Sequence, residues 1–146
     1  MPLQSKGRHP LDRRKFTLFA AAVGAAKLAF ASSGVDCTPG LVQQELDAGK
    51  TVFIEFYTDW CTTCRAQQRV ISALKSENPD YEANNSFVSV DWDKYRYSNL
   101  ARGQNIPRRP TLVILRGEEE LGRIVAGTHQ SAIRELMDTA FSAAVA

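Results

Sequence analysis

The chain has 146 residues, of which 44% are hydrophobic and 23% are charged, and its formal net charge at neutral pH is +2. This length suits one ordinary domain, and the composition is that of a globular rather than a disordered protein. Three cysteines are too few for a disulfide-stapled scaffold, and no apolar run is long enough for a free-standing membrane span.

The basic residues are concentrated at the N-terminal end of the chain. Residues 1–31 hold six Lys or Arg against one Asp, a net charge of +5, so the remaining residues carry a net charge of −3. A mildly acidic body argues against a nucleic-acid-binding surface. The charge of the N-terminal segment therefore needs a separate explanation.

This segment has the three parts of an export signal in the right order. A charged stretch is followed by a moderately apolar run and by a small-x-small sequence that ends at Ala31. The adjacent Arg13 and Arg14 resemble a bacterial twin-arginine signal. We expect cleavage after Ala31, so that residues 32–146 form one domain in the periplasm, an oxidising compartment. An ordinary amphipathic helix and an uncleaved membrane anchor are the alternatives.

The first elements predicted after the signal are a helix, a buried strand and a long helix. Residues 40–48 have apolar positions at helical spacing and are followed by Gly49. Residues 51–57 are a nearly continuous apolar and β-branched run, which predicts a buried strand. Residues 61–77 are predicted to form a helix that ends at the following Asn-Pro pair.

The second half of the chain predicts a strand over residues 86–90 and a weaker helix over residues 95–102. Residues 111–115 and 121–125 predict two strands joined by a turn short enough for an antiparallel hairpin. A last helix begins at about Gln130. The apolar stripe of this helix consists of Ile133, Leu136, Met137, Ala140, Phe141 and Ala144. The order of elements predicts an α/β fold in which helices flank a central mixed sheet with a C-terminal antiparallel hairpin.

Two cysteines lie where the buried strand turns into the long helix, in the sequence Trp60-Cys61-Thr62-Thr63-Cys64. Residues three apart in the first helical turn share one face, so the two sulfur atoms can form a disulfide. The unpaired N–H groups and the positive end of the helix dipole stabilise a thiolate at the first cysteine. We therefore expect Cys61 to attack disulfides and Cys64 to resolve the mixed disulfide.

Two other interpretations of the cysteine pair are weaker. Half of a zinc site would need further ligands, but the sequence has no second Cys-x-x-Cys, and its two histidines are His9 and His129. No metal is therefore expected. A purely structural disulfide would close a very short loop and constrain the unfolded chain little.

The residues around this pair resemble the thioredoxin family. Residues 52–65 are similar to that family's strand and active-site motif, and residues 106–112 and Gly127 are similar to its second half. The resemblance covers about residues 38–144. It implies a thioredoxin-like fold and disulfide exchange with protein substrates, without a metal or an organic cofactor.

The resemblance also implies roles for single residues. Pro110, directly before a predicted strand, matches the family's cis-proline beside the dithiol, with Pro107 as the competing candidate. Glu55 matches a buried acid behind the resolving cysteine. Strand alternation puts Glu55 inside, where its pKa should rise and it could relay the proton of Cys64; a position at an edge, or in a simple pair, is the alternative. Trp60 matches the aromatic residue that flanks the substrate site.

Three features depart from the family pattern. Thr62 and Thr63 stand between the cysteines, which is closer to the thioredoxin-like domains of membrane electron relays. Arg69 replaces a helix-kinking proline, so a straighter helix is expected. Arg109 precedes the expected cis-proline in the substrate-binding region, where its charge would favour the Cys61 thiolate. The alternative is that Arg109 points into solvent and meets an acidic substrate.

The sequence therefore predicts an exported thioredoxin-like thiol–disulfide oxidoreductase that acts on protein disulfides in the reducing direction. Its electron donor is expected to be a membrane relay protein, and its own membrane contact is expected only during export. An oxidase or isomerase of the same fold is the nearest alternative, and a redox-inactive binding or chaperone module is the alternative from another class. Cys37 is expected to be a free thiol, an intermolecular disulfide or a third redox thiol.

Overall fold

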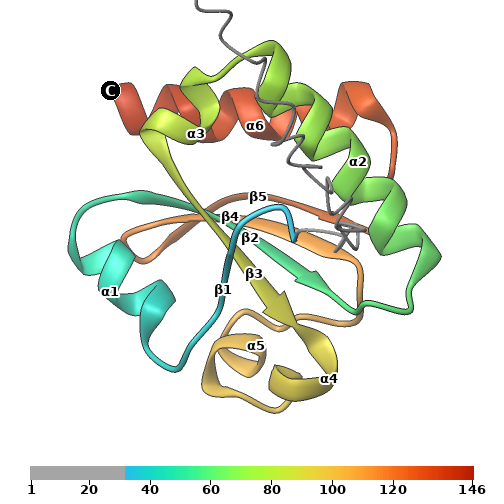
Figure 1. The fold of residues 1–146 in the computed structure, drawn as a ribbon. Coiled ribbons are helices and arrows are strands. Elements are labelled where there is room, and N and C mark those ends of the chain that lie inside the picture. Colours follow the sequence, from blue (N-terminus) through green and yellow to red (C-terminus); the bar gives the residue numbers. More distant parts are fainter. Residues whose placement is uncertain (1–31) are drawn as a thin grey trace, which may run out of the picture.

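The computed structural model describes residues 32–146, and the predicted export signal lies outside the described residues. The described chain forms one mixed sheet of five strands, in the order β1-β3-β2-β4-β5, with helices on both faces (Figure 1). The strands are β1 (Val35–Asp36), β2 (Thr51–Tyr57), β3 (Asn85–Asp91), β4 (Thr111–Arg116) and β5 (Glu119–Val125). The helices are α1 (Leu41–Asp47), α2 (Thr62–Glu77), α3 (Asp80–Asn84), α4 (Trp92–Tyr95), α5 (Asn99–Gly103) and α6 (Gln130–Val145).

The sheet combines parallel and antiparallel pairs. β2 and β3 run parallel and are joined by a crossover through α2, with Glu55 opposite Ser89. β4 lies antiparallel to β2, and the β4–β5 hairpin closes that side of the sheet. The hairpin turns at Gly117, whose φ of 57° suits a residue without a Cβ. The predicted α/β fold, with its mixed sheet and C-terminal hairpin, is confirmed.

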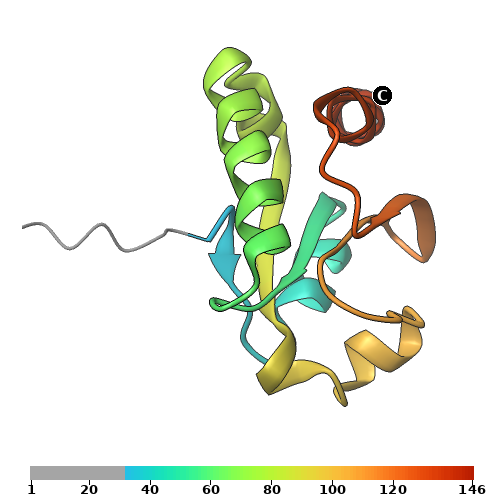
Figure 2. The same cartoon turned by 90° about the vertical axis from the view of Figure 1, so that its right-hand side faces the viewer.

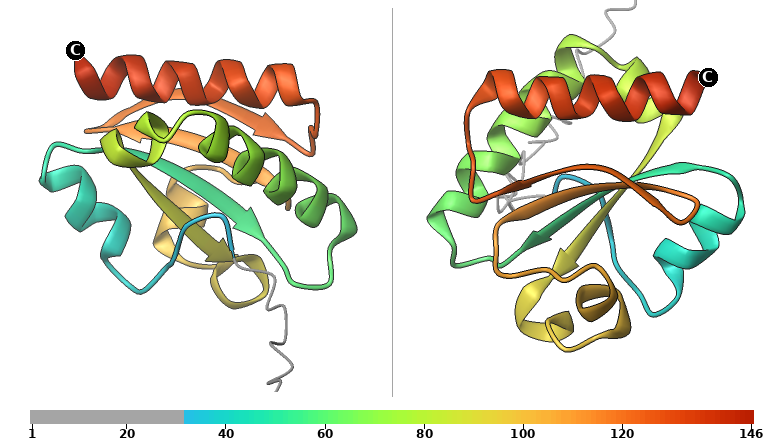
Figure 3. Two further views of the ribbon diagram at one scale, coloured as in Figure 1. Left: turned by 45° about the horizontal axis from the view of Figure 1, so that its top comes forward. Right: turned by 180° about the vertical axis from the view of Figure 1, so that it is seen from behind.

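The central strand β2 supplies side chains to two cores. Phe53 packs with side chains of α2, α3 and α6 on one face of the sheet. Val52, Ile54 and Phe56 pack on the other face with α1 and with the segment that holds α5. Figure 3 shows α2 and α6 lying over the first face and α1 beyond the second. The strand is apolar along nearly its whole length because both of its faces are buried.

The structure differs from the predicted elements in three places. β1 and α3 were not predicted, since two residues and five residues carry too little periodicity to be recognised. The helix predicted over residues 95–102 is wrong: two short helices, α4 and α5, occupy this region. The break has a local cause, because the Ser98 hydroxyl caps a new helix by accepting a hydrogen bond from the Ala101 N–H at 3.2 Å.

Within residues 32–146, no helix combines the length and the apolar character that a membrane crossing requires.

Candidate active site

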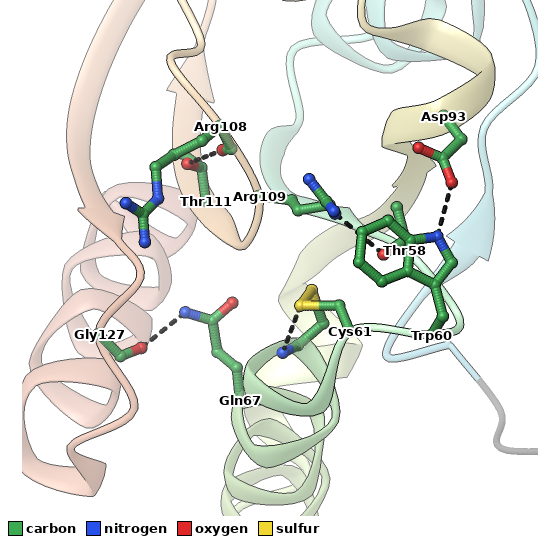
Figure 4. The surroundings of a disulfide bond; sticks show 10 residues. Thr58, Trp60, Cys61, Gln67, Asp93, Arg108, Arg109, Thr111 and Gly127 are labelled. Atoms are coloured by element: carbon green, nitrogen blue, oxygen red, sulfur yellow. Dashed lines mark hydrogen bonds between the residues drawn. A yellow bond between two sulfur atoms is a disulfide. The ribbon is translucent and has the colours of Figure 1, made fainter.

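The two cysteines of the predicted dithiol form a disulfide at the start of α2, with their Cα atoms 5.2 Å apart (Figure 4). Cys61 is the N-cap residue of this 16-residue helix, and its sulfur accepts a hydrogen bond from the Cys64 N–H at 3.1 Å. Cys61 is partly exposed, whereas Cys64 is fully buried. A partner protein can therefore contact the Cys61 sulfur. The Cys64 sulfur is shielded from partners and can react with the sulfur of Cys61.

The start of α2 favours a negative charge on the Cys61 sulfur. The N–H groups of the first helical turn point toward the cap position, and the helix dipole is positive at this end. Both effects lower the free energy of a thiolate relative to a thiol, and the thiolate is the form that attacks disulfides. The assignment of Cys61 as the attacking residue and of Cys64 as the resolving residue remains a prediction that this geometry supports.

Glu55 lies inside the domain beneath α2. Its side chain is 1% exposed, and it points to the same face of the sheet as Phe53, which packs against α2. Gln68 is one of the neighbours that lower the pKa of Glu55, and it lies one helical turn from Cys64 on the same face of α2. Glu55 therefore faces the side of α2 that carries the buried cysteine, and the alternative of a position at an edge is excluded.

Two hydroxyl groups hold the Glu55 carboxyl group, and no Lys, Arg or His within residues 32–146 forms an ion pair with it. The Ser33 hydroxyl donates to Oε2, and the Ser89 hydroxyl lies 3.5 Å from the same oxygen. Oε1 accepts no hydrogen bond from any of residues 32–146. Burial raises the pKa of Glu55 to about 7, against the opposing effect of the hydrogen bond from Ser33. The carboxyl group thus titrates near neutral pH, as predicted from its place in the strand.

The segment around Ser33 is fixed above Glu55 by contacts that the sequence did not reveal. The Lys75 ammonium donates to the Ser33 carbonyl oxygen, and the Gly34 N–H donates to the Ser89 hydroxyl at 3.0 Å. A Cβ at residue 34 would lie 2.8 Å from the Val88 backbone nitrogen, so this close approach requires glycine. Figure 2 shows the segment leading into β1 beside α2 and β3.

Trp60 and Arg109, two of the substrate-binding residues predicted from the resemblance, lie together beside the disulfide (Figure 4). The Arg109–Pro110 peptide bond is cis, so Pro110 and not Pro107 is the cis-proline. The Arg109 guanidinium carbon lies 3.9 Å from the centroid of the Trp60 ring, and its Nε donates to the Thr58 hydroxyl at 3.1 Å. Arg109 therefore packs on the indole ring of the residue that precedes Cys61 and does not point freely into solvent.

Sequence reasoning missed three polar residues of this region. Thr58 is buried and anchors Arg109, and Asp93 accepts a hydrogen bond from the Trp60 ring nitrogen at 2.8 Å. Gln67 is fully buried in α2, and its amide nitrogen donates to the Gly127 carbonyl oxygen at 2.7 Å. A polar residue one turn from Cys64, on an otherwise buried face, is the signal that could have identified Gln67.

Cys37 lies apart from the dithiol. It follows the edge strand β1 and packs against the core on the α1 side of the sheet, where it lines a cavity of about 500 Å³. Burial raises the pKa of its thiol, and it is not in a disulfide. Among the described residues, no three His, Cys, Asp or Glu side chains are grouped so that they could hold a metal ion.

Comparison with known proteins gives concordant results. The thioredoxin family model matches residues 36–139. Thioredoxin H5 of Oryza sativa subsp. japonica is 30% identical over 89 residues, which are 61% of this chain and 62% of that protein. Mitochondrial thioredoxin-2 of Schizosaccharomyces pombe is 32% identical over 80 residues, which are 55% of this chain and 56% of that protein. The chain thus matches only about 60% of the length of these curated relatives.

Solved structures share the fold. The crystal structure of Trxlp from Edwardsiella tarda EIB202 superposes with a TM-score of 0.62 at 22% sequence identity, over 71% of this chain and 98% of that one. At this level of identity the similarity concerns the arrangement of the sheet and helices. It supports the assignment of the fold.

Proposed function

The chain belongs to the thioredoxin family, and from this we propose that it is a thiol–disulfide oxidoreductase that exchanges disulfides with other proteins. One observation carries the proposal: Cys61 and Cys64 form a disulfide at the start of α2, with the first cysteine accessible and the second buried. This asymmetry separates an attacking from a resolving thiol. Reduction of insulin disulfides by the purified protein tests the proposal, and a Cys61→Ser variant should be inactive.

In the reducing direction the exchange has two steps. The Cys61 thiolate attacks one sulfur of a substrate disulfide, the substrate S–S bond breaks, and the other substrate sulfur leaves as a thiolate. The Cys64 thiolate then attacks the Cys61 sulfur, the mixed disulfide breaks, and the second substrate thiolate leaves. Two electrons have passed from the dithiol to the substrate, and the Cys61–Cys64 disulfide remains. A dithiol donor must reduce this disulfide before the next turnover.

Glu55 is suited to handle the proton of Cys64 in the second step. A thiol must lose its proton before it attacks, and a base is most effective when its pKa lies near the working pH. The pKa of Glu55, raised to about 7 by burial, meets this condition. A Glu55→Gln variant should therefore resolve the mixed disulfide more slowly while its initial attack stays unchanged. Resolution kinetics that do not change would leave Glu55 with a structural role.

The reducing direction, with electrons from a membrane relay protein, is our preferred assignment. The Thr62-Thr63 dipeptide, which resembles the thioredoxin-like domains of such relays, supports it. The Arg109 guanidinium near the dithiol supports the oxidase or isomerase alternative, because a stabilised thiolate favours the reduced form. The reduction potential distinguishes them: a value near ~−270 mV indicates a reductase and one near ~−120 mV an oxidase. A redox-inactive binding or chaperone module would leave insulin unreduced at any potential.

We also propose that the protein is exported to the periplasm by the twin-arginine route. The support is the order of charged, apolar and small residues in residues 1–31, together with Arg13 and Arg14. Replacing both arginines by lysine should leave the protein unprocessed in the cytoplasm. A product of the double variant that begins at Ser32 and appears in the periplasm would refute this route, although not export itself.

A further inference from the structure

The charge of Arg109 is fixed in place at the rim of the dithiol site. Its guanidinium carbon lies 3.9 Å from the centroid of the Trp60 ring, and its Nε donates to the hydroxyl of the buried Thr58. The indole is itself held, because its ring nitrogen donates to Asp93 at 2.8 Å. A long side chain that would otherwise sample many rotamers is therefore confined to one position next to the reactive pair.

The outer end of this guanidinium has donors that nothing occupies. Among the hydrogen bonds of residues 32–146, Arg109 uses only Nε, so both terminal amino groups are left without an acceptor. None of the ion pairs in this part of the chain involves Arg109. Asp93 accepts its hydrogen bond from the ring nitrogen of Trp60 and not from Arg109. The site thus presents a permanent positive charge on a part of the chain whose net charge is −3.

Two free amino groups at the end of a planar guanidinium form the fork that a carboxylate accepts with two parallel hydrogen bonds. Because stacking on Trp60 and the bond to Thr58 already fix the side chain, little further entropy is lost when a carboxylate binds. Trp60 is 61% exposed, so the stacked pair remains accessible to a macromolecular partner.

The position of the two terminal amino groups of Arg109 determines where a substrate protein must carry its carboxylate. Trp60 directly precedes Cys61, so the ring on which the guanidinium rests belongs to the residue next to the attacking cysteine. A protein that forms a mixed disulfide with Cys61 brings the neighbours of its own cysteine to this same rim. Side chains within about two residues of that cysteine can reach the fork.

We propose that Arg109 makes the site selective for protein substrates that carry an Asp or Glu within about two residues of the target cysteine. The inference rests on the proposed exchange function and names its substrate class. Arg109 acts here through its terminal amino groups, which bind the substrate carboxylate while the Cys61 thiolate attacks the neighbouring sulfur. Selection is by rate, since the carboxylate contact stabilises the encounter that precedes the formation of the mixed disulfide.

The test compares two short peptides that differ only in Glu or Gln beside their single cysteine. The cysteine is present as a 2-thiopyridyl disulfide, so that attack by Cys61 breaks the S–S bond and releases a leaving group without a carboxylate. The absorbance of the released pyridine-2-thione gives the rate. A Cys61→Ser form of each protein reports any attack by Cys37, or by the Cys64 thiol that this change frees, and is subtracted.

The wild-type protein should attack the Glu peptide about fivefold faster than the Gln peptide, and the ratio should fall as salt is added. Arg109→Gln should bring the ratio close to one. Any change in the pKa of Cys61 alters both rates alike and leaves the ratio unaffected. Arg108→Gln is the matched control. This arginine is adjacent and exposed, and it is Arg109 that packs on Trp60, so the variant should keep the wild-type ratio.

Three results would overturn the inference: a ratio of one in the wild type, a ratio retained in Arg109→Gln, or an equal loss in Arg108→Gln. If Arg109→Gln does not fold, Arg109→Lys replaces it. Lysine keeps the positive charge but lacks the two parallel amino groups, so the ratio of the Glu and Gln rates should fall. An unchanged ratio in this variant overturns the inference as well. If the wild type attacks neither peptide, the exchange function is itself wrong, and the selectivity falls with it.

Discussion

Replacing Glu55 by Gln should remove a pH dependence from the stability of the domain. Burial raises the pKa of Glu55 from 4.5 to about 7, so the folded protein binds this proton more tightly than the unfolded chain does. The free energy of unfolding must therefore fall as pH rises from about 4.5 to about 7. Since one pKa unit corresponds to about 1.4 kcal/mol, the ionised side chain costs about 3 kcal/mol above this range. Glutamine has a similar shape and never ionises.

Urea unfolding of the oxidised protein at pH ~4 and pH ~8 measures this effect. The disulfide keeps Cys61 and Cys64 from titrating, and subtracting the wild-type value removes the contribution of every other group. The advantage of Glu55→Gln over the wild type should grow by about 3 kcal/mol between the two pH values. Glu118→Gln, an exposed change of the same charge in the hairpin turn, is the control. An advantage of equal size at both pH values would refute the reasoning.

Three further predictions follow from contacts around the site. Arg109→Thr should raise the pKa of Cys61, measured by thiolate absorbance; superimposable titration curves would contradict it. Ser33→Ala removes a hydrogen bond that lowers the pKa of Glu55 in the folded state, so the loss of stability with pH, measured by urea unfolding, should extend to higher pH. Gly34→Ala should cost about 1–3 kcal/mol of unfolding free energy, because its Cβ would collide with the backbone of β3. Alanine at the glycine that ends α5, where nothing lies within 4 Å, should cost less.

The parts of the fold that were predicted correctly are those in which a local pattern specifies the element. The strand over residues 51–57 has the predicted bounds, because both of its faces are buried and its apolar run is continuous. α2 ends at the predicted residue, since Asn78 and the following proline cannot extend a helix. The cysteine pair was predicted correctly at the start of α2 for the same reason. The end of β2, the turn and the start of α2 are all specified by neighbouring residues.

The parts that were not predicted depend on residues far apart in the sequence. Alternation along β2 showed that Glu55 points inward, but the hydroxyl that binds it belongs to a residue 22 positions away. The bond that anchors Arg109 on Thr58 spans 51 positions. Such contacts form only when the sheet order brings the segments together, and no single-sequence pattern specifies that order.

The short segment around Ser33 belongs to the functional domain, although it precedes the part of the chain that the family model matches. The family match begins at residue 36, so a protein trimmed to that limit would lack the hydroxyl that binds Glu55 and the Gly34 N–H that orients Ser89. Its acid would sit in a partly opened cavity, with a different affinity for protons. Such a shortened protein would also lack Val35 of the edge strand β1, and its exchange chemistry would be that of a variant. The proposed cleavage after Ala31, by contrast, leaves the segment whole.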